Sequence, residues 1–482
     1  MKATFIFYNV LENKNAFSIP LSILSSCLKK AGHEVSLAIV NSQEKITKES
    51  FLSRLSPSDI FGFSALTGAF PEIKKLVLWI KEKYPKSLIV IGGSHALLDP
   101  EEVISSPGVD AVCIGEGEHC LVELANKIDR KKDIYDTKNF WFKKNGKIIK
   151  NQRLPLIEDL DTIPFLDRNL FDYYSLTDYK DGKQMVVMAS RGCPYNCGYC
   201  ANHLIRNLYP NKEKWLRFRK VDNVIKEIKG ILEKFGPHER VKFVDDTLVQ
   251  NKKWFEELIK KYPKEIGLPV DCQVRPNELD LDTLEKLKKL GVDRLEMGIE
   301  SGNEFIRYKI MNRHITNEQI INAYHIARQN KIPAISFNII GLPFENFDMI
   351  LDTVKINALA RPSWAKVLYF QPFPHTELLN ICEKFGFIKE YKILPTLFEG
   401  SPLESPYVSK VQLDFIYSNF RPLIKLYQIR VLWPLLDIIF SSKLFPYKFF
   451  IKISPLINLK EVLGAKFPRE IKSIKKLILR RK

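Results

Sequence analysis

Three cysteines in the spacing C-x₃-C-x₂-C constrain this sequence of 482 residues more than any other feature. Cys193, Cys197 and Cys200 follow an apolar run at residues 185–189, so they stand on a tight loop directly after a predicted strand. Three thiolates on one loop can hold three corners of a 4Fe–4S cluster, whereas a full set of four needs another cysteine close by. The next one downstream is Cys272, which leaves one iron open to a ligand that is not protein. The alternatives are three unrelated thiols or a zinc knuckle, although zinc sites normally use pairs of cysteines or histidines.

The cysteine loop opens a long stretch in which apolar runs alternate with helical patterns. Strands are expected at residues 185–190, 240–245, 269–273, 294–298, 334–340 and 365–371. Helices are expected between them, at residues 221–235, 252–262, 280–290, 317–330 and 347–360. Such alternation predicts a parallel sheet with helices outside it. We therefore expect an open, partial (β/α)₆ barrel, with its chemistry at the carboxyl ends of the strands.

A second run of strand–helix alternation precedes the cysteines. Strands are expected at residues 3–8, 35–40, 60–64, 87–91 and 111–114, and helices at residues 20–32, 71–84 and 118–128. This pattern predicts a doubly wound, Rossmann-like α/β domain, which binds ligands at the carboxyl edge of its sheet. Two turns fall at that edge and carry the candidate binding residues Gly92, Gly93, His95, Gly115, Glu116 and Gly117.

The cysteine triplet resembles the signature of the radical S-adenosylmethionine superfamily. In that family the amino and carboxylate groups of S-adenosylmethionine chelate the open iron, and one electron cleaves the sulfonium to a 5′-deoxyadenosyl radical. The phrases Gly92-Gly93-Ser94-His95 and Gly115-Glu116-Gly117-Glu118 resemble the N-terminal domain of its cobalamin-dependent members, the group of the anaerobic magnesium-protoporphyrin ester cyclase and the class B methylases. The D-x-H-x-x-G motif of other cobalamin proteins is absent here, as it is from several radical members. The resemblance covers about residues 1–395 and implies a 4Fe–4S cluster, S-adenosylmethionine and cobalamin as cofactors.

The same resemblance implies roles for residues at the ends of the barrel strands. Tyr199 occupies the position whose ring and backbone approach the adenine. Asp245 and Asp246 stand where the family receives the methionyl ammonium, which carboxylates accept in charge-assisted hydrogen bonds. Arg275 is a candidate contact to a carboxylate or ribose, with a structural ion pair as the alternative.

Two later strand ends complete the implied pocket for S-adenosylmethionine. Glu300 and Ser301 resemble the ribose-binding pair, although a glutamate at a strand end can also be a helix cap. Gly341 and Pro343 belong to a segment that resembles the one backing the adenine. In the N-terminal domain, His95 is a candidate contact to the corrin or its phosphate tail, with a turn histidine that binds nothing as the alternative.

The chain divides into four predicted segments. These are residues 1–145 as the cobalamin-binding domain, 146–184 as a linker, 185–395 as the barrel and 396–482 as a helical region with a basic tail. The net charge is +18, and residues 441–482 carry 12 lysines and arginines against two acidic residues. This tail could be a solvated basic helix, or it could contact an anionic membrane surface or nucleic acid.

We therefore expect a cobalamin-dependent radical enzyme that methylates or cyclises an unactivated carbon of a small molecule or lipid. The alternatives are an RNA methylthiotransferase, for which Cys27, Cys113 and Cys120 have the right number but the wrong spacing, and a non-enzymatic corrinoid or cluster sensor. An external electron donor such as ferredoxin or flavodoxin is implied, and nucleic acid is not expected as a partner. Scattered cysteines and the lack of a secretory pattern at residues 1–13 indicate a cytoplasmic protein. The basic tail is a candidate for peripheral contact with the inner face of the membrane.

Overall fold

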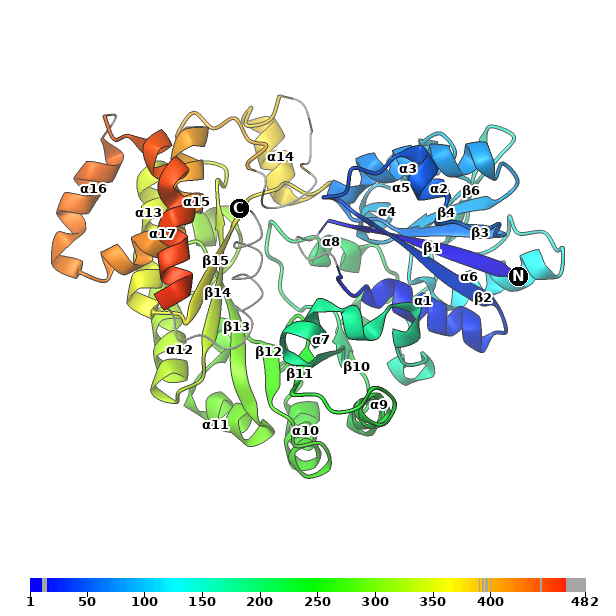
Figure 1. Cartoon of the computed structure of the whole chain (residues 1–482), viewed down its shortest axis with the longest axis horizontal. Helices are drawn as coiled ribbons and strands as arrows, with labels where there is room; N and C mark the ends of the chain where they lie inside the picture. The colour runs from blue at the N-terminus through cyan, green and yellow to red at the C-terminus, as the bar shows by residue number, and fades with distance from the viewer. Residues whose placement is uncertain are drawn as a thin grey trace. The chain divides into compact units, whose positions relative to one another are not determined.

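The computed structural model describes residues 1–10, 15–389, 391, 394, 398, 400–442 and 444–464, with no account of the side chains of 181 and 456–464. The chain forms two compact units (Figure 1). The first holds Met1–Lys180, Ala201–Arg219 and Phe373–His375, and the second holds Asp181–Cys200, Lys220–Pro372 and the described residues from Thr376 onward. Two pieces of the first unit, Ala201–Arg219 and Phe373–His375, thus come from the range predicted for the barrel.

The first unit is built on a seven-stranded sheet in the order β2-β1-β3-β4-β5-β6-β7. Its strands are β1 (Lys2–Asn9), β2 (Glu34–Asn41), β3 (Ile60–Ser64), β4 (Leu88–Gly92), β5 (Ala111–Cys113), β6 (Phe140–Lys144) and β7 (Lys147–Lys150). The first five strands are parallel, and β6 and β7 add an antiparallel hairpin. Asn145 and Gly146 both have positive φ at its turn, as a two-residue Asn-Gly hairpin requires.

Helices cover both faces of this sheet. They are α1 (Ile19–Lys30), α2 (Lys48–Leu52), α3 (Phe70–Lys83), α4 (Ser94–Leu98), α5 (Pro100–Ser105) and α6 (Gly117–Asp129). Neighbouring residues of β1 point to opposite faces, so Phe5 packs with α1 and α6, and Ile6 packs with α2, α3 and α5. The predicted doubly wound domain is confirmed. The unit also contains α8 (Asn202–Asn207), β10 (Arg217–Phe218) and most of α7 (Thr177–Gly182).

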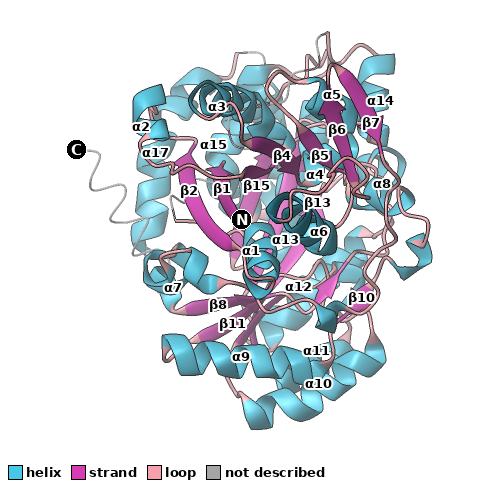
Figure 2. Ribbon diagram, turned by 90° about the vertical axis from the view of Figure 1, so that its right-hand side faces the viewer, coloured by secondary structure: helices cyan, strands magenta, loops and turns pink. Residues whose placement is uncertain are grey.

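The second unit contains six parallel strands in the order β15-β14-β13-β12-β11-β8. They are β8 (Gln184–Val187), β11 (Arg240–Phe243), β12 (Val270–Gln273), β13 (Val292–Glu300), β14 (Ala334–Ile340) and β15 (Trp364–Tyr369), with the short β9 (Ser190–Arg191) just after β8. The connecting helices are α9 (Val221–Phe235), α10 (Lys252–Glu265), α11 (Leu281–Leu290), α12 (Asn317–Gln329) and α13 (Phe347–Ala360). Helices α9, α10 and α11 lie along the outer side of this sheet (Figure 2). The predicted partial (β/α)₆ barrel is confirmed.

Helix ends follow from local sequence. The Asp280 carboxylate accepts a hydrogen bond from the Thr283 amide at 2.7 Å and starts α11, and Gly291 ends that helix in the left-handed conformation. Thr316 and Gln319 form a reciprocal capping box at the start of α12. Because these signals are local, the sequence predicts such helices to within a residue or two.

Four α-helices follow the last strand within the described residues, and the three after residue 396 confirm the helical C-terminal region. The four are α14 (Glu377–Lys384), α15 (Lys410–Tyr427), α16 (Trp433–Ser441) and α17 (Tyr447–Gly464). Helix α15 packs on α13 and β15 in one hydrophobic cluster. Among the described residues, no helix combines the length and apolarity needed to cross a bilayer. Residues 443 and 465–482 of the predicted basic tail lie outside the described residues.

Candidate functional site

The three cysteines of the loop lie at the carboxyl edge of the six-stranded sheet, just after β9. Cys197 is buried, and Cys193 and Cys200 are half-buried. Burial raises the pKa of the Cys193 thiol, and the nearby negative charge of Asp246 raises it further. Binding a metal would remove that proton, because the thiolate is the form that ligates.

The backbone of this loop is fixed by segments far along the chain. The Gly198 amide donates to the Met311 carbonyl at 2.8 Å, and the Leu378 amide donates to the Gly198 carbonyl at 3.4 Å. A Cβ at Gly198 would lie 3.0 Å from Leu378 Cδ1 and 3.1 Å from Glu377 Oε2. A side chain between these two cysteines would therefore force the Leu378 and Glu377 side chains to shift, and the loop is held at both sides.

Two buried arginines reach Cys197. Arg275 Nη1 lies 3.5 Å from Cys197 Sγ, and Arg313 Nη1 lies 4.0 Å from the same sulfur. The Arg275 guanidinium also stacks over the Tyr195 ring, 3.5 Å from its centroid, and Arg313 Nη2 donates to the Gly298 carbonyl at 2.6 Å. Two N–H donors of positive charge stabilise a thiolate at this position. Arg275 was a predicted site residue, whereas Arg313 was not.

Arg313 also approaches Glu300, one of the two predicted ribose-binding residues. Glu300 ends β13 at a bulge and has a φ of 68°, a strained conformation for a non-glycine residue. Burial raises the pKa of its carboxyl, while the charge of Arg313 and a hydrogen bond from Tyr199 oppose this effect. The predicted residues Tyr199 and Glu300 are thus in contact, next to Arg313.

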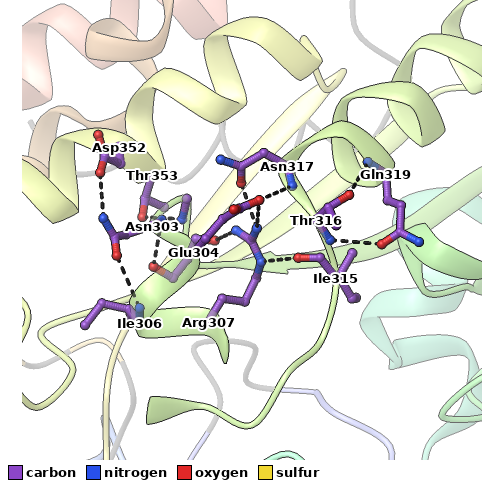
Figure 3. Close-up of polar contacts among 12 residues, drawn as sticks. Asn303, Glu304, Ile306, Arg307, Ile315, Thr316, Asn317, Gln319, Asp352 and Thr353 are labelled. Atoms are coloured by element: carbon purple, nitrogen blue, oxygen red, sulfur yellow. Dashed lines mark hydrogen bonds and ion pairs between the residues drawn. The ribbon is translucent and has the colours of Figure 1, made fainter. Parts of the chain in front are cut away.

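A second arginine that the sequence analysis missed fixes the turn after Glu300. Arg307 is fully buried and donates to the Ser301 carbonyl at 2.5 Å, the Ile315 carbonyl at 2.7 Å and Asn317 Oδ1 at 2.7 Å (Figure 3). Ser301 is itself fully buried. The arginine therefore joins the end of β13 to the start of α12.

The same turn is bound to α13. The Gly302 amide donates to Thr353 Oγ1 at 2.8 Å, and Asn303 Nδ2 donates to Asp352 Oδ2 at 2.8 Å (Figure 3). A Cβ at Gly302 would overlap the Asp352 carbonyl, so this approach needs glycine. The Glu300–Ser301 pair is held in place before any ligand binds.

The two aspartates after β11 differ in their surroundings. Asp245 is buried and accepts hydrogen bonds from the Ala189 amide at 3.0 Å and from both the amide and the hydroxyl of Ser190. Burial raises the pKa of Asp245 to about 6, although these hydrogen bonds oppose the rise. Asp245 thus anchors the strand that leads into the cysteine loop, and Asp246 is exposed at the edge. Their predicted contact with the methionyl ammonium stays a prediction.

The turn after β14 carries the predicted residues Gly341 and Pro343. Gly341 has a φ of 78°, and its amide donates to Glu345 Oε2 at 2.7 Å. The Leu342 amide donates to the same oxygen at 3.1 Å. Glu345 is fully buried, and burial raises its pKa to about 8. Glu345 is a third residue of the site that was not predicted from the sequence, although a glutamate four residues after the glycine of an apolar Gly-Leu-Pro-Phe turn is a signal that could have identified it.

In the first unit, the predicted cobalamin-binding glycines lie at or just after the ends of strands β4 and β5: Gly92, Gly93, Gly115 and Gly117. A Cβ at Gly93 would lie 2.7 Å from the Ala65 nitrogen, and one at Gly115 would lie 2.5 Å from Asn139 Oδ1. These glycines therefore allow neighbouring turns to pack closely. Their contact with a corrin stays a prediction.

His95 lies beneath this edge. Its side chain is only 2% exposed, and its ring centroid is 4.4 Å from that of Phe70. Its Nε2 atom lies 3.3 Å from Glu102 Oε2. The structure thus gives His95 a packing role within the domain, and the predicted corrin contact stays a prediction.

Glu116, in the turn before α6, is engaged within the first unit. Its two carboxylate oxygens accept hydrogen bonds from Arg217 Nη1 and Nη2, both at 2.9 Å, and Oε2 also accepts from the Ile157 amide at 2.7 Å. Arg217 belongs to the segment that follows Cys200 along the chain. Glu116 therefore binds that segment and residue 157 to the turn after β5.

The donor set of the cysteine loop fits an iron–sulfur cluster. Three thiols stand on one fixed loop, and two guanidinium groups stabilise the thiolate of Cys197. Throughout the described ranges, no three His, Cys, Asp or Glu side chains gather as the ligands of a single metal ion would. An iron–sulfur cluster does not need three side chains to converge on one ion, because each cysteine binds a separate iron.

Comparison with known proteins agrees with this chemistry. Residues 187–356 match the model of the Radical SAM superfamily, and residues 14–125 match that of the B12 binding domain. An uncharacterized methyltransferase of Pyrococcus horikoshii is 30% identical over 325 residues, which are 66% of this chain and 68% of that protein. The anaerobic magnesium-protoporphyrin IX monomethyl ester cyclase of Rubrivivax gelatinosus is 23% identical over 419 residues, 83% of this chain and 72% of that protein.

A solved structure shares the fold. The cobalamin-dependent S-adenosylmethionine radical enzyme OxsB, with aqua-cobalamin bound, superposes with a TM-score of 0.68 at 14% identity. The match covers 99% of this chain and 79% of that one. The order of an N-terminal α/β domain, a partial barrel and a C-terminal helical region is thus shared along nearly the whole chain.

Proposed function

Because this chain belongs to the radical S-adenosylmethionine enzymes that carry an N-terminal B12 binding domain, as its sequence predicts, we propose that it methylates an unactivated carbon of a small molecule or lipid. When bound, a 4Fe–4S cluster, S-adenosylmethionine and cobalamin would supply the electron, the 5′-deoxyadenosyl radical that takes a hydrogen atom from the substrate, and the methyl group. The protein would supply binding, orientation and electrostatics.

One observation carries the proposal: the end of β13 and the segments that follow β12 and β13 place Arg275, Arg313 and Glu300 around Cys197 and Tyr199. The two arginines stabilise the cysteine thiolate. Glu300 offers a carboxylate for a ribose hydroxyl, and its conformation is fixed before the ligand arrives. This is the arrangement expected of a site for S-adenosylmethionine beside an iron–sulfur cluster.

Cyclisation is the second candidate reaction. It is favoured by the similarity to the Rubrivivax cyclase, which extends over 83% of this chain. Methylation is favoured by the higher identity of the Pyrococcus methyltransferase. We give preference to methylation for that reason.

The match of residues 14–125 to the B12 binding domain also bears on the alternatives. An RNA methylthiotransferase would need a second cluster in that domain, where Cys27, Cys113 and Cys120 are all buried. Membership of an enzyme family argues against a sensor. We also propose that an external donor such as ferredoxin or flavodoxin supplies the electron, and that nucleic acid is not a partner.

The test uses protein that is reconstituted anaerobically with iron, sulfide and hydroxocobalamin. About four irons per chain and a corrinoid absorbance are expected. With dithionite and methyl-deuterated S-adenosylmethionine, mass spectrometry should detect 5′-deoxyadenosine and label on the cobalamin. Cys197→Ala should abolish 5′-deoxyadenosine, whereas Cys27→Ala, which removes a buried thiol away from the loop, should retain it. About eight irons per chain without corrinoid would overturn the proposal, and label-free product from a supplied substrate would favour cyclisation.

A further inference from the structure

The C-terminal region presents an apolar surface that the proposed chemistry does not use. We call it the α16 surface and define it by Val431, Leu435, Ile438, Leu444 and Phe449. Their exposed fractions are 83%, 54%, 71%, 93% and 56%. Helix α16 lies at the outer edge of its unit (Figure 1). Five large apolar side chains that are exposed this close together in the sequence make this region a candidate interaction site.

The opposite side of this region is firmly packed. Leu436 and Phe440 of α16 are buried in the cluster that also contains residues of α13 and α15. Phe445 lies 5.2 Å from Phe440 and stacks on Phe450 at 5.1 Å between ring centroids. The exposed residues are therefore presented on a fixed base, so their exposure is a property of the folded chain.

The spacing of the exposed residues gives the surface its geometry. Val431, Leu435 and Ile438 are four and three residues apart, so they lie on one side of a helical path. Leu444 and Phe449 follow in the connection to α17 and in its first turn. These side chains project from a helix and a turn. Such a surface is better suited to insertion into a lipid layer than to binding in a preformed protein pocket.

Exposed basic residues predominate around the surface, although Asp348, whose Oδ1 accepts a hydrogen bond from the Ser441 hydroxyl at 2.9 Å, is an exposed acidic residue at the end of α16. Arg430, Lys448 and Lys452 are exposed beside it. The only acidic residue in the sequence between 429 and 455 is Asp437, whose carboxylate accepts hydrogen bonds from Lys355 and the Tyr427 hydroxyl, both at 2.8 Å. In the sequence, residues 441–482, which include Lys448 and Lys452, carry 12 basic against two acidic residues. Any partner should therefore be apolar and anionic.

We propose that the α16 surface binds the interfacial region of an anionic lipid membrane. Aliphatic and aromatic side chains would enter the boundary between headgroups and acyl chains, while the flanking basic residues would contact lipid phosphates. Helix α16 has nine residues, far fewer than the roughly 20 needed to span a bilayer, so the contact lies in the membrane plane. A second copy of the chain fits less well, because two such surfaces would bring like charges together.

Vesicle co-sedimentation of the full-length protein tests this proposal. Binding is expected to vesicles that contain phosphatidylglycerol, to weaken between about 0.1 M and about 0.5 M salt, and to be much weaker to phosphatidylcholine alone. The double variant Val431→Ser/Ile438→Ser should weaken binding by about tenfold or more. The matched control Leu78→Ser/Leu281→Ser removes two aliphatic side chains that are 49% and 63% exposed elsewhere, and it should bind as the unchanged protein does.

The remaining outcomes each overturn the proposal. Full binding by the Val431→Ser/Ile438→Ser variant would place the membrane contact elsewhere. Equal binding to both kinds of vesicle would remove the anionic requirement, and no binding to either would remove the membrane. An oligomer in sedimentation velocity that this variant alone dissociates would assign the surface to self-association. If both variants still form 5′-deoxyadenosine, both are folded. Failure of the membrane proposal can therefore be told apart from failure of the proposed chemistry.

Discussion

The guanidinium of Arg275 donates a hydrogen bond to the sulfur of Cys197 at 3.5 Å, and both groups are buried. Hydrogen bonds to the sulfurs of an iron–sulfur cluster help to set its reduction potential, because they stabilise the more negative, reduced form. Arg275, which follows strand β12 of the barrel, is therefore expected to influence the reduction potential of a cluster held by this loop.

Replacing this arginine should lower the cluster potential. In Arg275→Gln the positive charge is lost. If the arginine stabilises the reduced cluster over the oxidised one by about 1 kcal/mol, its loss lowers the potential by an amount on the order of 40 mV for one electron. A redox titration followed by electron paramagnetic resonance measures it. Arg240→Gln is the matched control, because Arg240 pairs with Asp293 at the opposite edge of the same sheet. Equal potentials in all three proteins would show that Arg275 does not reach the cluster.

Arg307 should be essential for the turn that holds Glu300 and Ser301. Arg307→Met would leave the carbonyls of Ser301 and Ile315 buried without their donor, at a cost of about 3 kcal/mol or more. We expect a lower midpoint of thermal unfolding and weaker binding of S-adenosylmethionine by calorimetry. Arg328→Met, on the exposed side of α12, should change neither. A stable Arg307→Met protein with unchanged ligand affinity would contradict this role.

The sequence predicted the two sheets well because their signals are local. The bounds of β3, α9, β14 and α13 match the expected ranges residue for residue, since each element is a clear apolar or amphipathic run between breaks in the pattern. The positions of the cysteines, Arg275 and Glu300 followed from strand ends, which parallel topology collects at one edge.

The missed residues depend on contacts that no local pattern encodes. Arg313 reaches Cys197 across 116 positions of sequence, and Arg307 was hidden in an irregular stretch with a π-helical turn. The use of Asp245 as an anchor was also not predictable, because its partners Ala189 and Ser190 are brought to it only by strand pairing. Tertiary contacts decide which charged residue of a motif faces a ligand and which supports the backbone.

Glu345 should make stability depend on pH. Burial raises its pKa to about 8, so between about pH 4.5 and pH 8 the folded state holds a proton that the unfolded state has lost. The contribution of this group is therefore full at low pH, and stability falls by up to about 1.4 kcal/mol per pH unit as pH rises to 8. Glu345→Gln cannot ionise and should remove that fall.

Urea unfolding at pH 5.5 and pH 8, followed by tryptophan fluorescence, measures the effect as a shift in midpoint. The urea midpoint of Glu345→Gln should increase relative to that of the unchanged protein as pH rises from 5.5 to 8. Glu72→Gln, a substitution on the first helix turn of α3 in the other unit, is the control and should follow the unchanged protein. The prediction fails if Glu345→Gln and the unchanged protein lose stability in parallel.

Substitutions of the neighbouring residues Asp245 and Asp246 should have different effects, because the first supports the cysteine loop and the second is predicted to contact a ligand. Asp245→Asn replaces an acceptor oxygen with an amide group that faces the donors of Ala189 and Ser190, so we expect a loss of about 1–3 kcal/mol and fewer irons per chain. Asp246→Asn changes an exposed group at the same edge and should leave unfolding and iron content unchanged, while weakening binding of S-adenosylmethionine. Iron analysis, thermal unfolding and calorimetry on the two variants test both halves. If instead Asp246→Asn loses iron and Asp245→Asn does not, the anchoring role belongs to the exposed residue.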